Sequence, residues 1–343
     1  QSAQARRTRL VEIDGRSAGA EQAKNTIHGR ASLVPLDSPA ARLSGSVLGV
    51  DAGALALGGS CETMQGEAVI DRASCVSFGP SPALTPYVRR VLIIDDVDSV
   101  VAQQVPAWCK HYLVVHYGGT VERTVEGRAE LVPRTLISGS YTSPFAMRGT
   151  GARLSFAAAE LTPTGFFSLF GHAAAEICDR VPDVRDLIPA RRRHQIVEAL
   201  AEARTTASRR AIFEHFLTAM VPAGRDRARV AHVRQAVELI QRRHGQLTVS
   251  ELCSEIGLSH SWMRARFAEV VGLSPKAFIE TTRISRAFDQ VLSSGTEKVL
   301  GSHLAQDLGY YDQAHFIRAF RRYTGFAPSR LPPSAFHLAR MFS

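Results

Sequence analysis

Arginine, glutamine and histidine side chains recur in the last third of the chain at the spacing of α-helices. The first set comprises Ser261, Arg264 and Arg266, and the second comprises Gln313, Ala314, His315, Arg318, Arg321 and Arg322. A guanidinium presents a fork of N–H donors that matches phosphate oxygens and the edge of guanine, and a side-chain amide matches the edge of adenine. These residue types therefore predict recognition of nucleic acid rather than bond-breaking chemistry.

The first polar set lies on the second helix of a predicted helix-turn-helix. Residues 248–251 read Thr-Val-Ser-Glu, a capping box that marks a helix start. Gly257 then supplies a left-handed stop, and Ser259 caps the next helix. Met263 and Phe267 are four residues apart and share the inward face. This spacing turns Ser261, Arg264 and Ala265 outward and places Trp262 and Arg266 toward the flanks.

The same pattern recurs after a long connecting helix. Ser274 is an N-cap and Pro275 occupies the first helical position, so a helix is predicted from there to about Leu292. A second helix-glycine-helix pattern follows, in which a tyrosine fills the turn and two phenylalanines face inward. The residues of this second pattern are Leu300, Leu304, Ala305, Gly309, Tyr310, Asp312, Phe316 and Phe320. Two helix-turn-helix units joined by a strut are therefore expected.

Residues from about Val233 to Leu331 resemble the DNA-binding domain of the AraC/XylS family of bacterial transcription regulators. The stretch Gly309–Arg322 reads GYYDQAHFIRAFRR and is similar to the family signature G-[FY]-x-D-x-[SA]-[HY]-F-x-R-x-F-[KR]. The resemblance implies two recognition helices in successive major grooves, about one helical turn apart. It implies base or groove contacts for Ser261, Arg264, Gln313, Ala314 and His315, and phosphate contacts for Arg318 and the neighbouring arginines.

Two positions depart from the family pattern. Ala265 stands where the family usually has a basic residue, and Arg264 or Arg266 is expected to compensate. Gly301 occupies a position where many members hold a larger side chain. These two departures weaken the expectation of base contacts more for the first unit than for the second.

The N-terminal part of the chain has short β-type runs separated by glycine turns, which is typical of an antiparallel sandwich or a cupin-like barrel. The predicted strands are Ala31–Leu36, Ser46–Val50, Val69–Phe78, Val91–Ile94, His111–His116, Ala129–Ile137 and Arg153–Ala158. Trp108–Gly119, Gly139–Pro144 and Leu154–Leu169 resemble a sensor module that precedes such DNA-binding domains. The fold class expected is therefore α+β, with a β-rich sensor and an all-α tandem helix-turn-helix domain.

Helical spacing begins after Thr164 and continues in one amphipathic stretch from Ile196 to Met220. Its face of Ile212, Phe213, Phe216 and Met220 either joins two copies of the chain or packs on its own domain. The domains predicted are a poorly ordered segment 1–30, a sensing and dimerisation domain 31–221, a linker 222–230, the DNA-binding domain 231–332 and a tail 333–343. The mouth of the barrel is a common place for a small ligand.

Composition limits the remaining classes of function. The 343 residues have a net charge of +9 and a pI near 9.7, which favours an anionic partner. No apolar run approaches the ~18 residues of a membrane span, and residues 1–30 lack the apolar core of a secretory signal, so a cytoplasmic protein without membrane contact is predicted. The five cysteines lie far apart and are expected to be reduced.

Metal and catalytic sites are not expected. Packing is favoured over metal binding for Cys109, His111, His116 and His172, because they form no H-x-H pair followed by a carboxylate. No G-x-S-x-G, H-E-x-x-H or phosphate-binding glycine loop occurs, so neither a cofactor nor an enzymatic activity is predicted.

The sequence thus predicts a transcription regulator, either an activator or a repressor, whose partners are double-stranded DNA, RNA polymerase, a small-molecule effector and a second copy of the chain. One alternative is a DNA-directed enzyme of the alkyl-transfer repair type. Such an enzyme needs an activated cysteine, and neither Cys75 nor Cys109 lies in a Pro-Cys-His or zinc-binding setting. The other alternative is a sensor that acts mainly through protein contacts.

Overall fold

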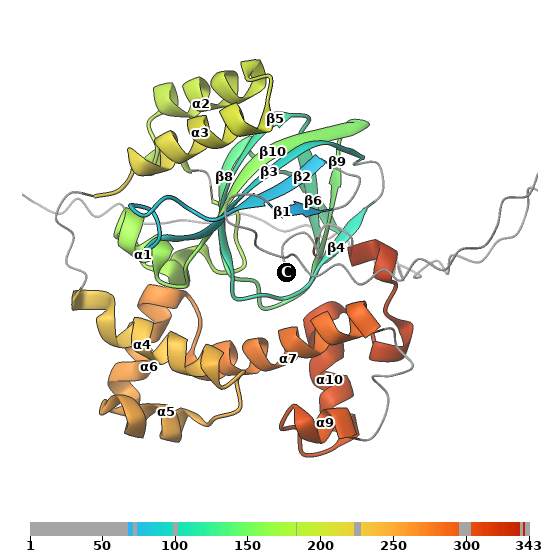
Figure 1. Cartoon of the computed structure of the whole chain (residues 1–343). Helices are drawn as coiled ribbons and strands as arrows, with labels where there is room; N and C mark the ends of the chain where they lie inside the picture. The colour runs from blue at the N-terminus through green and yellow to red at the C-terminus, as the bar shows by residue number, and fades with distance from the viewer. Residues whose placement is uncertain are drawn as a thin grey trace, which may run out of the picture. The chain divides into compact units, whose positions relative to one another are not determined.

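A computed structural model describes residues 68–70, 74–98, 102–182, 184–222, 228–294, 303–336 and 339. These residues form two antiparallel β-sheets followed by helices, which confirms the expected α+β class (Figure 1). The predicted segment 1–30, the predicted strands 31–36 and 46–50, and the positions Leu300 and Gly301 lie outside the described residues.

The larger sheet has six strands in the order β1-β2-β3-β10-β5-β8, and all neighbours are antiparallel. Its strands are β1 (Ala68–Ile70), β2 (Ser74–Phe78), β3 (Val88–Asp98), β5 (His111–Gly118), β8 (Thr135–Ser138) and β10 (Arg153–Leu161). Seven consecutive residues of β5 are buried, so this strand has both faces covered rather than the alternation of a half-exposed strand. The continuous apolar run in its sequence reflects that position.

The smaller sheet has the order β4-β9-β6-β7. Its apolar side chains and those of the larger sheet form one hydrophobic core between them. Its strands are β4 (Gln103–Val105), β9 (Phe145–Gly149), β6 (Val121–Val125) and β7 (Arg128–Leu131). Glu126 and Gly127 have φ of 50° and 78° and connect β6 to β7. Two positive φ values at the central residues are what a tight hairpin turn requires.

Two predicted strands are corrected by the structure. The run Ala129–Ile137 is not one strand: it contains the end of β7 in the smaller sheet and the start of β8 in the larger one. Pro133 lies between them, and a proline cannot donate a hydrogen bond to a sheet, so the run breaks there. The run Val69–Phe78 likewise includes both β1 and β2, which pair with each other. The strands β4, β6 and β9 were not predicted.

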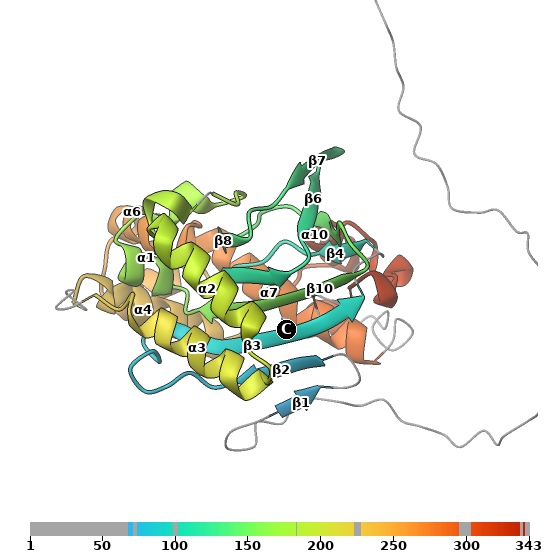
Figure 2. The same ribbon diagram turned by 90° about the horizontal axis from the view of Figure 1, so that it is seen from above.

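Helices cover one face of the larger sheet: α1 (Gly165–Phe170), α2 (Ala190–Glu202) and α3 (Thr206–Thr218). Figure 2 shows α2 and α3 lying alongside each other over the strands. The amphipathic stretch expected to be continuous is two helices, because Ala203 is extended and Thr205 forms a capping box with Ser208. Phe213 and Phe216 are buried in the domain's own core, with Ile212 and Met220 against it, which favours self-packing over a dimer interface.

The C-terminal helices are α4 (Ala228–Arg242), α5 (Val249–Ile256), α6 (His260–Val271), α7 (Pro275–Ser294), α9 (His303–Asp307) and α10 (Gln313–Thr324). We call α5 with α6 the first unit and α9 with α10 the second unit. The first unit shares a hydrophobic core with α4 and the start of α7, and the second shares another with the remainder of α7. Helix α4 begins inside the predicted linker 222–230, and Phe336 of the predicted tail is fully buried in the core of the second unit.

Among the helices that the structure describes, none combines the length and the apolar character that a membrane span needs.

Candidate nucleic-acid interface and sensor pocket

The first unit is fixed by local hydrogen bonds that its sequence predicts. Thr248 Oγ1 accepts from the Glu251 amide at 3.2 Å, and Glu251 Oε2 accepts from the Thr248 amide at 2.7 Å. These hydrogen bonds lower the pKa of Glu251, because they stabilise the carboxylate. Gly257 ends α5 with φ of 75°, and Ser259 Oγ accepts from the Trp262 amide at the start of α6. The predicted capping box, stop and cap are all present.

Helix α6 turns its apolar side chains inward and presents two small side chains and one arginine to solvent. Met263 and Phe267 are fully buried, as predicted. Ser261, Arg264 and Ala265 are exposed. Arg266 is half-buried on the flank, where its Nη1 lies 2.5 Å from Glu269 Oε2. The charge of this arginine is therefore matched within its own helix, and Arg264 is left as the exposed cation of the α6 surface.

The second unit has the same construction with a different cap. Gly309 has φ of 73°, and the Tyr310 amide donates to the Ala305 carbonyl at 2.8 Å to close the turn. Asp312 Oδ1 accepts from the His315 amide at 2.6 Å, which makes it the N-cap of α10. Phe316 and Phe320 are buried. A carboxylate at this position also complements the positive end of the helix dipole.

The open face of α10 is strongly cationic. The predicted side chains Gln313, Ala314, His315, Arg318, Arg321 and Arg322 are all exposed. Arg322 Nη2 lies 3.2 Å from Glu280 Oε2 on α7, whereas Arg318 and Arg321 have no ion pair among the described residues. Next to this face, the side chain of Tyr311 is 91% exposed. The structure brings the predicted residues of each unit together on the surface of one helix. Tyr311 was not predicted to take part, although its position directly before the N-cap Asp312 indicated that its side chain would be exposed.

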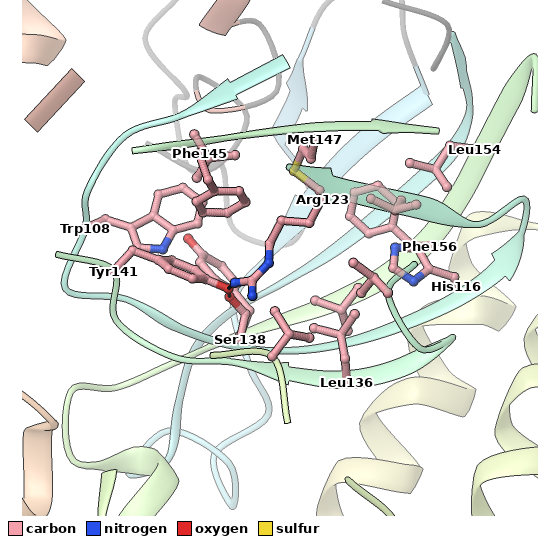
Figure 3. Close-up of a pocket in the computed structure, with 16 residues that line it drawn as sticks. Trp108, His116, Arg123, Leu136, Ser138, Tyr141, Phe145, Met147, Leu154 and Phe156 are labelled. Atoms are coloured by element: carbon pink, nitrogen blue, oxygen red, sulfur yellow. Dashed lines mark hydrogen bonds between the residues drawn. The ribbon is translucent and has the colours of Figure 1, made fainter. Parts of the chain in front are cut away.

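A cavity lies between the two sheets of the N-terminal domain (Figure 3). It has a volume of about 70 Å³, and most of its walls are apolar, including Val114, Leu136, Met147 and Phe156. The polar groups Arg123, Ser138 and Tyr141 converge at one end, and His116 lies beside Phe156 at the other. An apolar chamber with a few convergent polar groups is the usual form of a small-molecule site.

Arg123 is the charged group of this cavity and is 7% exposed. Its Nη1 donates to Tyr141 Oη at 3.2 Å, and its Nε donates to Glu130 Oε1 at 2.6 Å. Ser138 Oγ donates to Tyr141 Oη at 3.2 Å. Glu130 is exposed on β7, so the guanidinium connects the interior of the cavity to a carboxylate at the surface. No pattern in the sequence indicated this arginine, because strand β6 was not predicted.

The buried histidines of this domain are uncharged near neutral pH. Burial lowers the pKa of His116 to about 4, and the same cause lowers that of His111 to about 4. Among the described residues, neither His116 Nδ1 nor His111 Nδ1 has a hydrogen-bond partner, while Ser140 Oγ lies 3.2 Å from His111 Nε2. Within the described part of the chain, no group of three or more His, Cys, Asp or Glu residues is arranged to hold a metal ion.

The cysteines give no support to the repair-enzyme alternative. Burial raises the pKa of the Cys109 thiol to about 12, and Cys75 is 1% exposed. An alkyl-transfer nucleophile needs an accessible thiolate, which a low pKa provides. The two thiols singled out by the sequence therefore have the properties of packing residues.

Comparison with known proteins divides the chain in the same way. Residues 252–332 match the family model "Helix-turn-helix domain", and residues 76–183 match "Domain of unknown function (DUF6597)". The uncharacterized HTH-type transcriptional regulator YidL of Escherichia coli is 29% identical over 100 residues, which are 28% of this chain and 33% of YidL. The HTH-type transcriptional regulator ExsA of Pseudomonas aeruginosa is 30% identical over 98 residues, 28% of this chain and 34% of ExsA. These matches span about a third of each relative.

Among solved structures, ToxT from Vibrio cholerae aligns with 70% of this chain and 96% of its own at 10% identity, with a TM-score of 0.40. The unsaturated fatty acid bound form of ToxT aligns with a TM-score of 0.39 at 11% identity, over 70% of this chain and 92% of its own. The C-terminal helices form two helix-turn-helix units. The match to a helix-turn-helix model and the two related transcriptional regulators agree with the AraC-type resemblance found in the sequence of this domain.

Proposed function

We propose that the protein is a transcription regulator that binds promoter DNA through the two units and responds to a small molecule held in the N-terminal domain. The observation that carries the proposal is the exposed cationic face of α10, placed directly after a helix-turn-helix turn. A recognition helix in the major groove contacts bases through its N-terminal residues. Gln313 and His315 occupy that part of α10, and Arg318 and Arg321 follow toward its C-terminal end.

The proposed division of labour follows from side-chain chemistry. Arg318 and Arg321 bind phosphates, because they have long cationic side chains and no ion-pair partner in the described protein. Gln313 donates and accepts hydrogen bonds at a base edge, as an amide does with adenine. On α6, the small side chains of Ser261 and Ala265 let the helix backbone approach the groove closely. Phosphate contacts set orientation and base contacts set sequence preference.

The test is selection of bound sequences from a random pool of duplexes by the full chain. An enriched site with two half-elements about one helical turn apart supports the proposal. The salt dependence of binding to that site is then measured beside a scrambled duplex of equal length. Equal affinity for both duplexes would contradict sequence-specific regulation and leave only charge-driven binding.

The cavity of the N-terminal domain is proposed as the effector site. Its apolar walls and the buried Arg123 suit a small molecule with an apolar body and one anionic or acceptor group. The volume of about 70 Å³ is below the ~150 Å³ of a cavity that binds benzene, so binding requires side chains to move. We infer that the ligand's carboxylate replaces Glu130 as the partner of Arg123, because Glu130 lies at the surface.

This second proposal is tested by calorimetry with small aromatic carboxylates and their uncharged amides. Arg123→Met should weaken carboxylate binding at least about tenfold, or ~1.4 kcal/mol, and leave amide binding nearly unchanged. Arg128→Met is the matched control, because Arg128 is exposed on β7 and does not line the cavity. Equal binding of acid and amide would refute the preference for an anion, and no binding of either would refute the site.

Regulation requires the effector to favour one arrangement of the protein over another. RNA polymerase and a second copy of the chain are further proposed partners of an activator acting in the cytoplasm. A dimer is not needed for two half-elements to be bound, because one chain contains two recognition helices. The proposed function involves no catalytic step.

A further inference from the structure

The two units have separate hydrophobic cores that share only the long helix α7. Phe278 and Ile279 of α7 belong to the core of the first unit. Ile284 and Phe288 of the same helix belong to the core of the second. The boundary between the cores falls at Arg283, so whatever this side chain contacts helps to set the position of one unit relative to the other. Figure 1 shows α7 running from one unit to the other.

Arg283 links the α4–α5 connection, which leads into the first unit, to the turn of the second unit with one guanidinium. Its Nε and Nη2 donate to the Gly245 carbonyl at 3.0 and 2.6 Å, after the end of α4 on the side of the first unit. Its Nη1 donates to the Gly309 carbonyl at 3.2 Å, in the turn of the second unit. The guanidinium carbon also lies 5.7 Å from the ring centroid of Tyr310, the residue that fills that turn.

The two carbonyls are held by their own surroundings. Gly245 has φ of 73°, and a Cβ there would lie 2.5 Å from the Ile279 carbonyl oxygen, so this segment touches α7 as only glycine allows. Gln246, the next residue, donates from Nε2 to the Asp307 carbonyl at the end of α9 at 2.5 Å. Two polar links, from Arg283 and from Gln246, therefore join the α4–α5 connection before the first unit to the second unit.

We propose that Arg283 is a positioning residue that fixes the register between the two recognition helices, and thereby the spacing of the two DNA half-elements that the protein accepts. The inference rests on the proposed DNA binding. The Gly309 carbonyl lies three residues before the cap of α10, so holding it holds the N-terminal end of the second recognition helix. A planar guanidinium can bridge two carbonyls in fixed directions, which the point charge of lysine cannot do.

The spacing of half-elements is a sensitive readout of this register. Each inserted base pair moves one half-element by about 3.4 Å and turns it by about a tenth of a helical turn. The selected site is rebuilt with the two half-elements one or two base pairs nearer or farther. The wild-type chain should lose at least about tenfold in affinity when the spacing changes by one base pair. Arg283→Ala should bind the best site less tightly and reduce that penalty to less than about threefold.

Three variants make the result specific. Arg286→Ala removes an exposed arginine from the same helix and should keep the wild-type penalty. Arg283→Lys keeps the charge and should still lose spacing discrimination. Gln246→Ala removes only the hydrogen bond to the Asp307 carbonyl and should partially relax the discrimination between spacings. This variant replaces Arg283→Ala in the test if Arg283→Ala does not fold. A merely structural role for Arg283 predicts equal loss at every spacing with an unchanged penalty, and that result would overturn the inference.

A second measurement does not depend on DNA. Spin labels are attached through a non-natural amino acid at Ala265 on α6 and Ala314 on α10, both exposed. The distance distribution should be narrow in the wild-type chain and in Arg286→Ala, and at least twice as broad in Arg283→Lys. An unchanged width in Arg283→Lys would overturn the inference, whether or not the wild-type chain selects a DNA site. Failure of the wild-type chain to select a DNA site is a separate outcome, and it would refute only the proposed function.

Discussion

The first and second units share a construction and differ in the surface that they offer. Both end their first helix at a left-handed glycine and cap the second with an oxygen side chain. On α10 the open face has Arg318 and Arg321, neither with an ion-pair partner in the described residues. On α6 the corresponding face has Ser261, Ala265 and a single exposed arginine, Arg264, while Arg266 is paired with Glu269. The turns and caps that build a unit therefore do not determine the charge of the helix face that it exposes.

This difference indicates unequal contributions to binding. Cationic side chains contribute affinity that does not depend on sequence and that weakens as salt rises, because each neutralised phosphate releases counterions. Small side chains contribute little to this salt-dependent affinity, but they permit the helix to approach the bases closely. We expect the second unit to supply most of the general affinity for DNA and the first unit to contribute mainly to selectivity.

The largest expected effect comes from truncating each core in turn. Phe267→Ala and Phe320→Ala each remove a fully buried ring and should cost about 3–5 kcal/mol in the free energy of unfolding. Because the cores are separate, Phe320→Ala should abolish detectable binding, whereas Phe267→Ala should lose the specific site and retain salt-sensitive binding to any duplex. Urea unfolding and binding titrations measure both. Equal loss of general affinity in the two variants would show that the units contribute equally.

A smaller effect is expected at the bases. Gln313→Ala should reduce the preference for one base pair of the second half-element by about 1–3 kcal/mol, because a bidentate contact is removed. Ser261→Ala on α6 should change preference less, since a hydroxyl forms a single hydrogen bond. Competition binding against single-base variants of the selected site gives both values. Uniform weakening on every sequence by Gln313→Ala would assign this residue to the backbone of DNA instead.

A further difference is expected in the dependence on salt. Arg318→Ala should lower the slope of log affinity against log salt by about 0.9, the value for one phosphate contact on duplex DNA. Arg266→Ala should change the slope far less, because Glu269 already compensates its charge. The two slopes are measured on the same duplex over the same salt range. A full unit of slope lost in Arg266→Ala would mean that DNA displaces Glu269.

The sequence was sufficient for the helical domain because its determinants are local. Thr248, Ser259 and Asp312 accept hydrogen bonds from amides three residues later, and such spacings are visible in one dimension. The predicted inward residues of both units are buried for the same reason. Arg283 escaped notice because its acceptors are 38 and 26 residues away, and no local pattern reports such a contact.

The β-rich domain was predicted in class and in part of its strands, because the runs at β3, β5 and β10 were found in the sequence. The strands β6 and β9 were not predicted, since they are short and have mixed residues. Pairing between β10 and both β3 and β5 depends on residues more than 30 positions apart, so the order of strands could not be obtained. The cavity with Arg123 depends on that order, which is why the candidate effector site became visible only in three dimensions.

The smallest expected effect tests whether charge alone distinguishes the units. Ala265→Arg places a cation on the open face of α6, at an exposed position where the related family usually has one. If the two helices present their faces to DNA in equivalent ways, the salt slope should steepen by about 0.9 and general affinity should rise, with the preferred sequence little changed. Ala268→Arg, on a less exposed part of α6, is the matched control and should have a weaker effect. If Ala265→Arg instead weakens binding to the selected site, the small side chain is needed for close approach to the groove. In that case the alanine is a determinant of selectivity in the first unit and not merely a missing charge.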